Sequence, residues 1–156
     1  MNEKASVYWN EFWKGKVAPS SVDAWQFGME GSPMADELAS LVISGKKTAT
    51  CAAHAWYEDG SETLPAVGDH SIILNSNNAP VAIIKITDVQ VMPMNEVPVE
   101  FAIAEGEGDL SYDYWWEGHK KFFTLDLAEL GKEFSEDMLV VCERFELVDV
   151  KATDAH

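Results

Sequence analysis

The chain has 156 residues, of which 47% are hydrophobic and 11% aromatic, a composition that suits one folded domain and excludes a disordered chain. Eleven basic residues against 27 acidic ones give a net charge of −16, which opposes binding to an extended nucleic-acid duplex. No apolar run is long enough to span a bilayer, no secretory signal is visible at the N-terminus, and two cysteines are too few for a disulfide scaffold. Together these features predict a protein of the reducing cytoplasm without a membrane partner.

The first third of the chain contains the best-defined predicted helix. Before it, the first twenty residues carry apolar residues at helical spacing, followed by Gly15, and Pro19-Ser20-Ser21 ends this segment. VDAWQF (22–27) then predicts a short strand. The main helix begins at Ser32, a residue suited to the N-cap, and carries apolar residues at i, i+4, i+7 and i+8. Gly45 stands where a left-handed C-terminal cap belongs, so it marks the end of this helix.

The rest of the chain predicts a mixture of strands and helices. The expected elements are strands at 70–75, 80–87 with an extension beyond Asp88, and 138–150, and helices at 98–105 and 111–129. This pattern predicts an α+β fold, a small mostly antiparallel β-barrel with flanking helices. We expect one domain over residues 1–150 and a disordered tail at 151–156.

The stretch GKKTAT (45–50) places two lysines beside two hydroxyl groups. Lys47 could act as a base if burial favoured its neutral form, and Thr50 needs such a partner to become a nucleophile. In a regular strand, positions three apart face opposite sides, so the two residues meet only if the backbone bends between them. The alternative is a solvated helix C-terminus, where the positive charges of Lys46 and Lys47 interact favourably with the negative end of the helix dipole.

The stretch EGEGDLS (105–111) places carboxylates between glycines. If the segment is extended, Glu105, Glu107 and Asp109 share one face, and their mutual repulsion raises at least one pKa, which suits acid–base chemistry. The alternative for Asp109 and Ser111 is capping of the helix that follows. Capping does not explain the glycines, which indicate a backbone that passes close to another group.

Aromatic side chains form a third pattern. Trp25 and Phe27 alternate on one face of the predicted strand, while Tyr112, Trp115 and His119 share one side of the predicted helix. Aromatic faces of this kind stack on nucleobases. The alternative is a stripe of side chains that pack into the core.

Other motifs rank lower. G-x-G-x-x-S at 106–111 resembles part of a phosphate loop, but the flanking carboxylates would repel phosphate. The acidic residues lack the spacing of an EF-hand, so no metal site and no cofactor are predicted. Cys51 and His54 could imitate a thiol–imidazole pair, although a buried structural cysteine is far more common.

In this order the motifs resemble those of the ASCH (activating-signal-cointegrator homology) domain family. The resemblance covers nearly the whole chain and rests chiefly on ADELASLVISGKKTAT (35–50) and EGEGDLSYDYWWEGHKKFF (105–123), with EFSEDMLVVCERFELV (133–148) at the end. It implies a barrel akin to the PUA fold and ligands that are RNA, nucleotides or modified nucleosides.

The family includes small members that hydrolyse the amide of N4-acetylcytidine with a lysine, a threonine and a glutamate. The resemblance places these roles on Lys47, Thr50 and Glu107, with Glu105 as the competing acid. Thr50 would attack the acyl carbon, Lys47 would take its proton, and Glu107 would hold Lys47 or pass the proton to the leaving amine.

The predicted partner is a small nucleoside-like substrate or a short RNA, and the oligomeric state is not predicted. The predicted binding residues are Trp25, Phe27, Lys46, Glu105, Ser111, Tyr112, Trp115 and His119. The alternative function is an RNA- or nucleotide-binding module, or a ribonuclease in which Lys47 and Ser111 matter. We favour the hydrolase because a phosphate binder gains nothing from the two glutamates.

Overall fold

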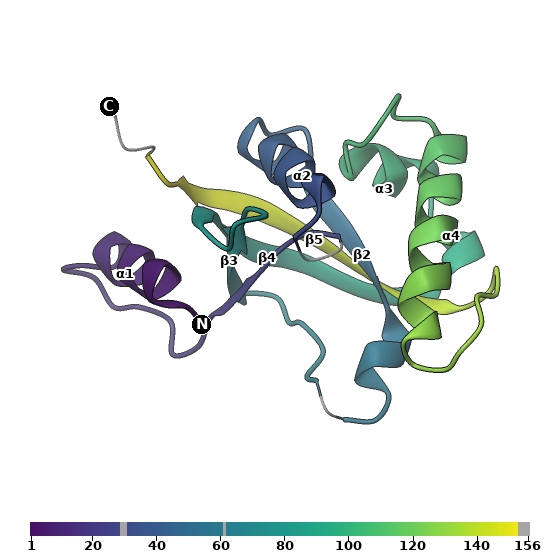
Figure 1. The fold of residues 1–156 in the computed structure, drawn as a ribbon, viewed down its shortest axis with the longest axis horizontal. Coiled ribbons are helices and arrows are strands. Elements are labelled where there is room, and N and C mark those ends of the chain that lie inside the picture. The colour runs from purple at the N-terminus through teal and green to yellow at the C-terminus, as the bar shows by residue number, and fades with distance from the viewer. Residues whose placement is uncertain (29–30, 61, 153–156) are drawn as a thin grey trace.

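The computed structural model describes residues 1–28, 31–60 and 62–152 of the chain. Its helices and strands follow one another in a mixed order (Figure 1). They are α1 (Glu3–Phe12), β1 (Asp23–Trp25), α2 (Pro33–Ile43), β2 (Ala49–Ala53), β3 (His70–Leu74), β4 (Pro80–Pro93), α3 (Val99–Ala104), α4 (Tyr112–Ala128) and β5 (Leu139–Val150). Two short 3₁₀ helices, η1 (His54–Tyr57) and η2 (Met94–Glu96), complete the set. This order confirms the predicted α+β fold.

The five strands form one sheet in the order β1-β3-β4-β5-β2. The pairing of β1 with β3 is parallel and the other three pairings are antiparallel, so the predicted mostly antiparallel sheet is confirmed. The long strands β4 and β5 curve together across the molecule in Figure 1. Because β1 and β2 are the two edges of this curved sheet and do not pair with each other, the sheet is a half-barrel.

The helices cover different parts of the sheet. α1 packs Ala5, Tyr8 and Trp9 against β3 and β4, and α2 packs Leu38 and Val42 against the middle of the sheet. At the opposite end from α1, the helices α3 and α4 lie together and join the cluster built on β2 and β5 (Figure 1). The core of the described residues therefore consists of three apolar clusters along one sheet.

The chain bends sharply between α2 and β2. Gly45 has a φ of 81°, and the backbone N–H groups of Lys46 and Lys47 both donate to the Leu41 carbonyl oxygen at 3.0 Å. The Thr48 N–H then donates to the Ala104 carbonyl oxygen at 2.7 Å, after which β2 begins. These bonds form a helix C-terminal cap that turns the chain toward α3, as the position of Gly45 predicted.

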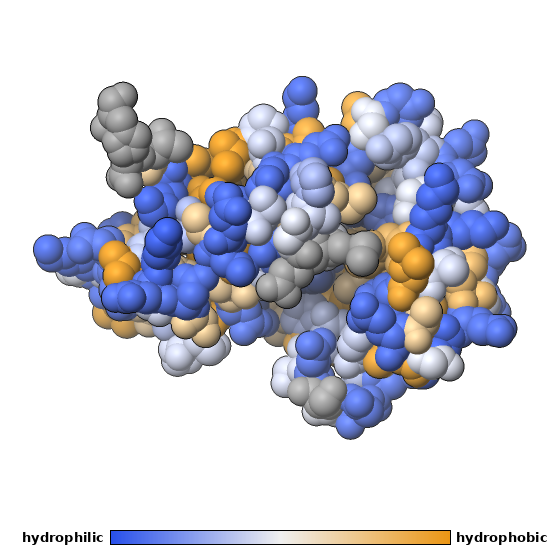
Figure 2. All heavy atoms as spheres, viewed as in Figure 1, coloured by the Kyte–Doolittle hydropathy of each residue, from blue (hydrophilic) through white to orange (hydrophobic). Residues whose placement is uncertain are grey.

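Hydrophilic side chains dominate the face of the molecule shown in Figure 2, and hydrophobic ones gather there only in small groups. No helix in the described part of the chain combines the length and apolar character that a membrane span requires. At the C-terminus the Lys151 N–H donates to the Val81 carbonyl oxygen at 2.9 Å, so the chain still contacts the sheet there. Residues 153–156 of the predicted tail lie outside the described residues.

Candidate active site

Lys47 lies in the protein interior, where only 2% of its surface is exposed. Its ammonium Nζ lies 3.2 Å from Glu105 Oε1 and 3.0 Å from Glu107 Oε2, and it also donates to the Glu105 carbonyl oxygen at 3.4 Å. On another side, Nζ lies 5.4 Å from the centre of the Phe27 ring. A buried ammonium is costly unless charged partners surround it, and here two carboxylates do so. The alternative of a solvated helix terminus therefore does not apply to Lys47.

Glu105 is fixed by three donors. In addition to Lys47, the indole N–H of Trp115 donates to Oε2, and His119 Nε2 lies 3.0 Å from the same oxygen. Burial alone would raise the pKa of the Glu105 carboxyl. The charges of His119 and Lys47, with the hydrogen bonds from His119 and Trp115, outweigh burial and hold this pKa below its ordinary value. Glu105 is therefore an ionised carboxylate with little freedom to move.

His119 completes the cluster as a cation. Its Nδ1 lies 2.8 Å from the Trp115 carbonyl oxygen, which only accepts hydrogen bonds, so Nδ1 carries a proton. Its Nε2 faces the Glu105 carboxylate and must also carry one. Burial lowers the pKa of His119, but the attraction of Glu105 and Glu107 outweighs it and raises the pKa above its ordinary value. The positive charges of Lys47 and His119 thus balance the negative charges of Glu105 and Glu107.

Glu107 differs from Glu105 in its freedom. Its side chain is 23% exposed, and Lys47 supplies the one hydrogen bond to its carboxylate that occurs among the described residues. Three donors hold the buried Glu105 carboxylate, whereas the Glu107 carboxylate is paired with Lys47 and stays partly exposed.

The prediction that Glu105, Glu107 and Asp109 share one face of an extended segment is wrong. Glu105 is the C-cap of α3 and has a helical conformation, and Gly106, Gly108 and Leu110 then adopt positive φ values of 71°, 59° and 65°. This tight loop turns two carboxylates inward to Lys47. Asp109 instead accepts a bond from the Ser111 N–H at 2.9 Å, and Ser111 caps α4, as the capping alternative proposed.

The positive φ of Gly106 brings its backbone against the turn after α2. A Cβ at this position would overlap the Lys46 carbonyl oxygen and lie 2.9 Å from the Lys47 nitrogen. Because these are backbone atoms, they cannot move aside as a flexible side chain would. The glycine therefore permits the close approach that places Glu105 and Glu107 around Lys47.

We expect Gly106→Ala to lower the free energy of unfolding by about 2 to 5 kcal/mol, from the combined cost of the left-handed conformation and the overlap. The matched control is Gly45→Ala, at a φ of 81° with nothing within 4 Å of the added Cβ, which isolates the conformational cost. Denaturant unfolding measures both variants. Equal losses in the two variants would contradict the close approach at Gly106.

A cavity of about 150 Å³ opens onto this cluster. Its lining includes Lys47, Glu105 and Glu107 from the two turns, Thr50 from β2, Phe27 after β1, and Trp115 and His119 from α4. The structure thus brings the three predicted catalytic residues, and four of the predicted binding residues, to the wall of one cavity.

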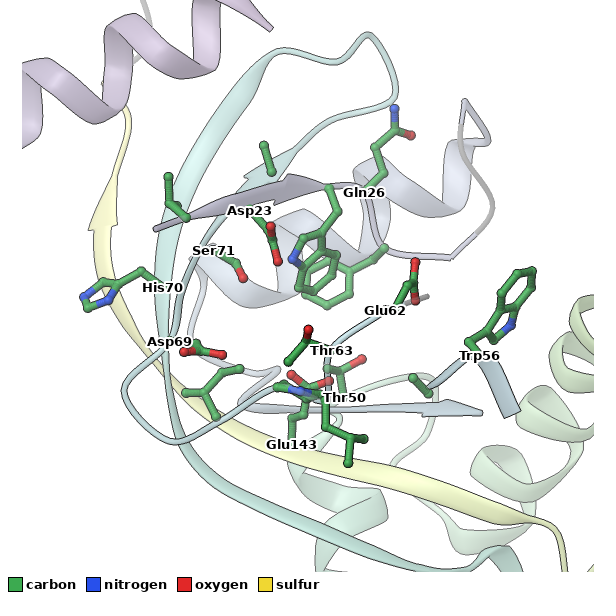
Figure 3. A pocket seen from close by; sticks show the side chains of 18 of the residues that line it. Asp23, Gln26, Thr50, Trp56, Glu62, Thr63, Asp69, His70, Ser71 and Glu143 are labelled. Carbon is green, nitrogen blue, oxygen red and sulfur yellow. The ribbon is translucent and has the colours of Figure 1, made fainter. Parts of the chain in front are cut away.

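A larger cavity of about 1340 Å³ lies in the gap between the edge strands (Figure 3). Trp25, the remaining aromatic residue predicted on β1, lines it, and so does Glu143 of β5, the cross-strand neighbour of Thr50. The residues that line both cavities are Phe27, Gly28, Thr50, Cys51 and Phe122. The two cavities are therefore adjacent, and Thr50 lies at their boundary.

Other predicted residues lie elsewhere. Lys46 is exposed, Ser111 caps α4, and Tyr112 stacks on Trp115 at 5.5 Å between ring centres; none of the three lines either cavity. Cys51 is buried, and His54 contacts Glu58, so the two do not pair with each other.

Glu105, Glu107 and His119 could also hold a metal ion, since one donor atom from each lies within 4.8 Å of the others. The Lys47 ammonium already lies against both carboxylates. A cation at this position would have to displace Lys47 or meet its repulsion. The donor set therefore fits the ammonium better than a metal ion.

Comparison with known proteins agrees with this architecture. A family model described as the ASCH domain matches residues 23–149. The crystal structure of an ASCH domain from Lactobacillus crispatus JV V101 is 34% identical, covers 94% of this chain and 95% of its own, and has a TM-score of 0.88. A protein from Enterococcus faecalis V583 is 42% identical over 96% of this chain and 91% of its own, with a TM-score of 0.86. Among curated proteins, none matches significantly. The chain therefore belongs to the ASCH domain family.

Proposed function

We propose that the protein is a metal-independent amidohydrolase that acts on an acylated nucleoside such as N4-acetylcytidine. The observation that carries this proposal is the burial of Lys47 between Glu105 and Glu107 in the wall of a cavity that Thr50 also lines. A base, an alcohol and an acid around one cavity are the groups that a covalent acyl transfer needs.

The sizes of the two cavities support a substrate with a small and a large part. The smaller cavity, at about 150 Å³, equals the volume of about five water molecules at roughly 30 Å³ each, enough for a short acyl group. The larger cavity has room for a nucleoside, and Trp25 of β1 and Phe27 after it line its wall. An amide bond between the two parts would then lie at Thr50.

The reaction we propose begins with a proton moving from Lys47 to Glu107, across the 3.0 Å between Nζ and Oε2. The neutral amine of Lys47 takes the hydroxyl proton of Thr50 as Oγ1 forms a bond to the acyl carbon. The Glu107 acid then gives its proton to the amide nitrogen as the carbon–nitrogen bond breaks and the amine leaves. Water, deprotonated by Glu107, hydrolyses the ester on Thr50, and the Lys47 ammonium returns its proton to Oγ1.

The test is the release of carboxylic acid from a panel of acylated nucleosides by purified protein in the presence of a metal chelator. Turnover of at least one member is the expected result. Lys46→Ala is the matched control, because Lys46 is exposed and lines neither cavity, and we expect it to keep full turnover. No turnover across the panel would contradict the hydrolase. Saturable, salt-sensitive binding of a short RNA without turnover would support the binding module instead.

A further inference from the structure

We propose that the larger cavity is a subsite for the amine half of the substrate that accepts an unphosphorylated nucleoside and rejects its 5′-phosphate, with Glu143 as the specificity-determining residue. The link to turnover rests on the proposed hydrolase, but the selectivity itself follows from the cavity. It can therefore be tested without any reaction.

The charge of the cavity wall is the first argument. Five carboxylate side chains line it, together with His70 and the N-terminal residue Met1, and the described lining residues include neither a lysine nor an arginine. These carboxylates belong to Asp23, Glu62, Asp69, Asp126 and Glu143. Because carboxylates outnumber the cationic groups of this wall, a phosphate that enters the cavity meets net electrostatic repulsion. A nucleoside without a phosphate meets no such penalty.

Glu143 is the second and independent argument. It is only 9% exposed, and its carboxyl group forms no hydrogen bond or ion pair with any residue in the described ranges. It lies among the side chains that surround the cavity in Figure 3, so its remaining exposure opens into that cavity. A carboxyl that is largely removed from solvent and has no protein partner is available to a group that enters the cavity. A ligand that donates a hydrogen bond would supply the missing partner.

The position of Glu143 connects this carboxyl to the reaction site. Glu143 on β5 pairs directly with Thr50 on β2, the residue at the boundary of the two cavities. Burial, with Asp69 nearby, raises the pKa of Glu143 to about 7. Near neutral pH the group can therefore both donate and accept hydrogen bonds. Hydroxyl, amino and carbonyl groups of a nucleoside are suitable partners for it.

The experiment measures equilibrium binding of cytidine and cytidine 5′-monophosphate by titration calorimetry. We expect the wild-type protein to bind cytidine about tenfold or more tightly than the monophosphate at low salt, and added salt to narrow this ratio. Glu143→Gln keeps the shape and removes the charge, and we expect it to reduce the ratio by about threefold or more. Glu146→Gln, an exposed residue on the same strand outside the cavity, is the matched control and should leave the ratio unchanged.

Thermal melting establishes that each variant is folded. If Glu143→Gln does not fold, Asp69→Asn replaces it, since Asp69 lines the same cavity and asparagine can still accept the bond from the Ala66 N–H. Equal affinity of wild-type protein for the two ligands, no binding of cytidine, or a ratio unchanged in the cavity variant would overturn the proposal. Selective binding of cytidine without turnover of any acylated nucleoside would support this subsite and contradict the proposed hydrolase.

Discussion

Replacing Lys47 with methionine is expected to reduce turnover strongly and to destabilise the protein. Methionine fills a similar volume but leaves Glu107 without its hydrogen-bond donor and Glu105 with two donors in place of three. Removing one partner of a buried ion pair costs about 3 to 5 kcal/mol, and loss of a general base costs about 10² to 10⁴-fold in rate. Denaturant unfolding and the acyl-release assay measure the two effects separately.

A second substitution separates the structural role of Lys47 from its role in the reaction. The double variant Lys47→Met with Glu107→Gln removes one uncompensated carboxylate, so we expect it to recover part of the lost stability and none of the lost turnover. Lys46→Met is the control on the neighbouring exposed lysine, with an expected stability change within about 0.5 kcal/mol. Near wild-type turnover by folded Lys47→Met would exclude Lys47 as the base.

Replacing Thr50 with valine is expected to reduce turnover by about 10³-fold or more while the protein stays folded. Valine keeps the branched shape that suits a strand and removes only the hydroxyl group. Thr50 is half-buried on β2, and no side-chain hydrogen bond of its hydroxyl occurs in the described part of the structure. Its loss should therefore affect the reaction far more than the fold.

Thr50→Ser is the matched control, because it restores a hydroxyl at the same position. We expect it to keep a measurable part of the turnover that valine loses. Mass spectrometry of protein quenched during turnover should find the acyl group on Thr50 in the wild type and not in the valine variant. Full turnover by Thr50→Val would instead indicate direct attack by water on the amide.

Local sequence patterns predicted the helices well because caps and apolar spacing act within a few residues. The Ser32 and Gly45 signals bracket α2 at Pro33–Ile43, although the Ser32 hydroxyl itself makes no capping bond. The predicted helix at 111–129 corresponds to α4 at Tyr112–Ala128. The short, alanine-rich β2 lacks the alternation that identifies a strand, so its bounds follow from pairing with β5.

The site was predictable in part. The burial of Lys47 and its contact with Glu107 agree with the arrangement proposed from the sequence. The loop that carries the carboxylates has three residues with positive φ, whereas the sequence pattern predicts an extended segment. Glu143 gave no sequence signal, because its burial arises from the curvature of β5 and from its pairing with Thr50. Such features depend on tertiary structure and not on local preference.

The sequence distance between the partners in the cluster has a consequence for folding. Lys47 lies 58 positions before Glu105, and the backbone bond from Thr48 to Ala104 spans 56. Contacts of such high contact order require closure of a long loop and form slowly compared with local turns. We therefore expect hydrogen exchange during refolding to protect the Thr48 amide only after the amides of α2 and α4.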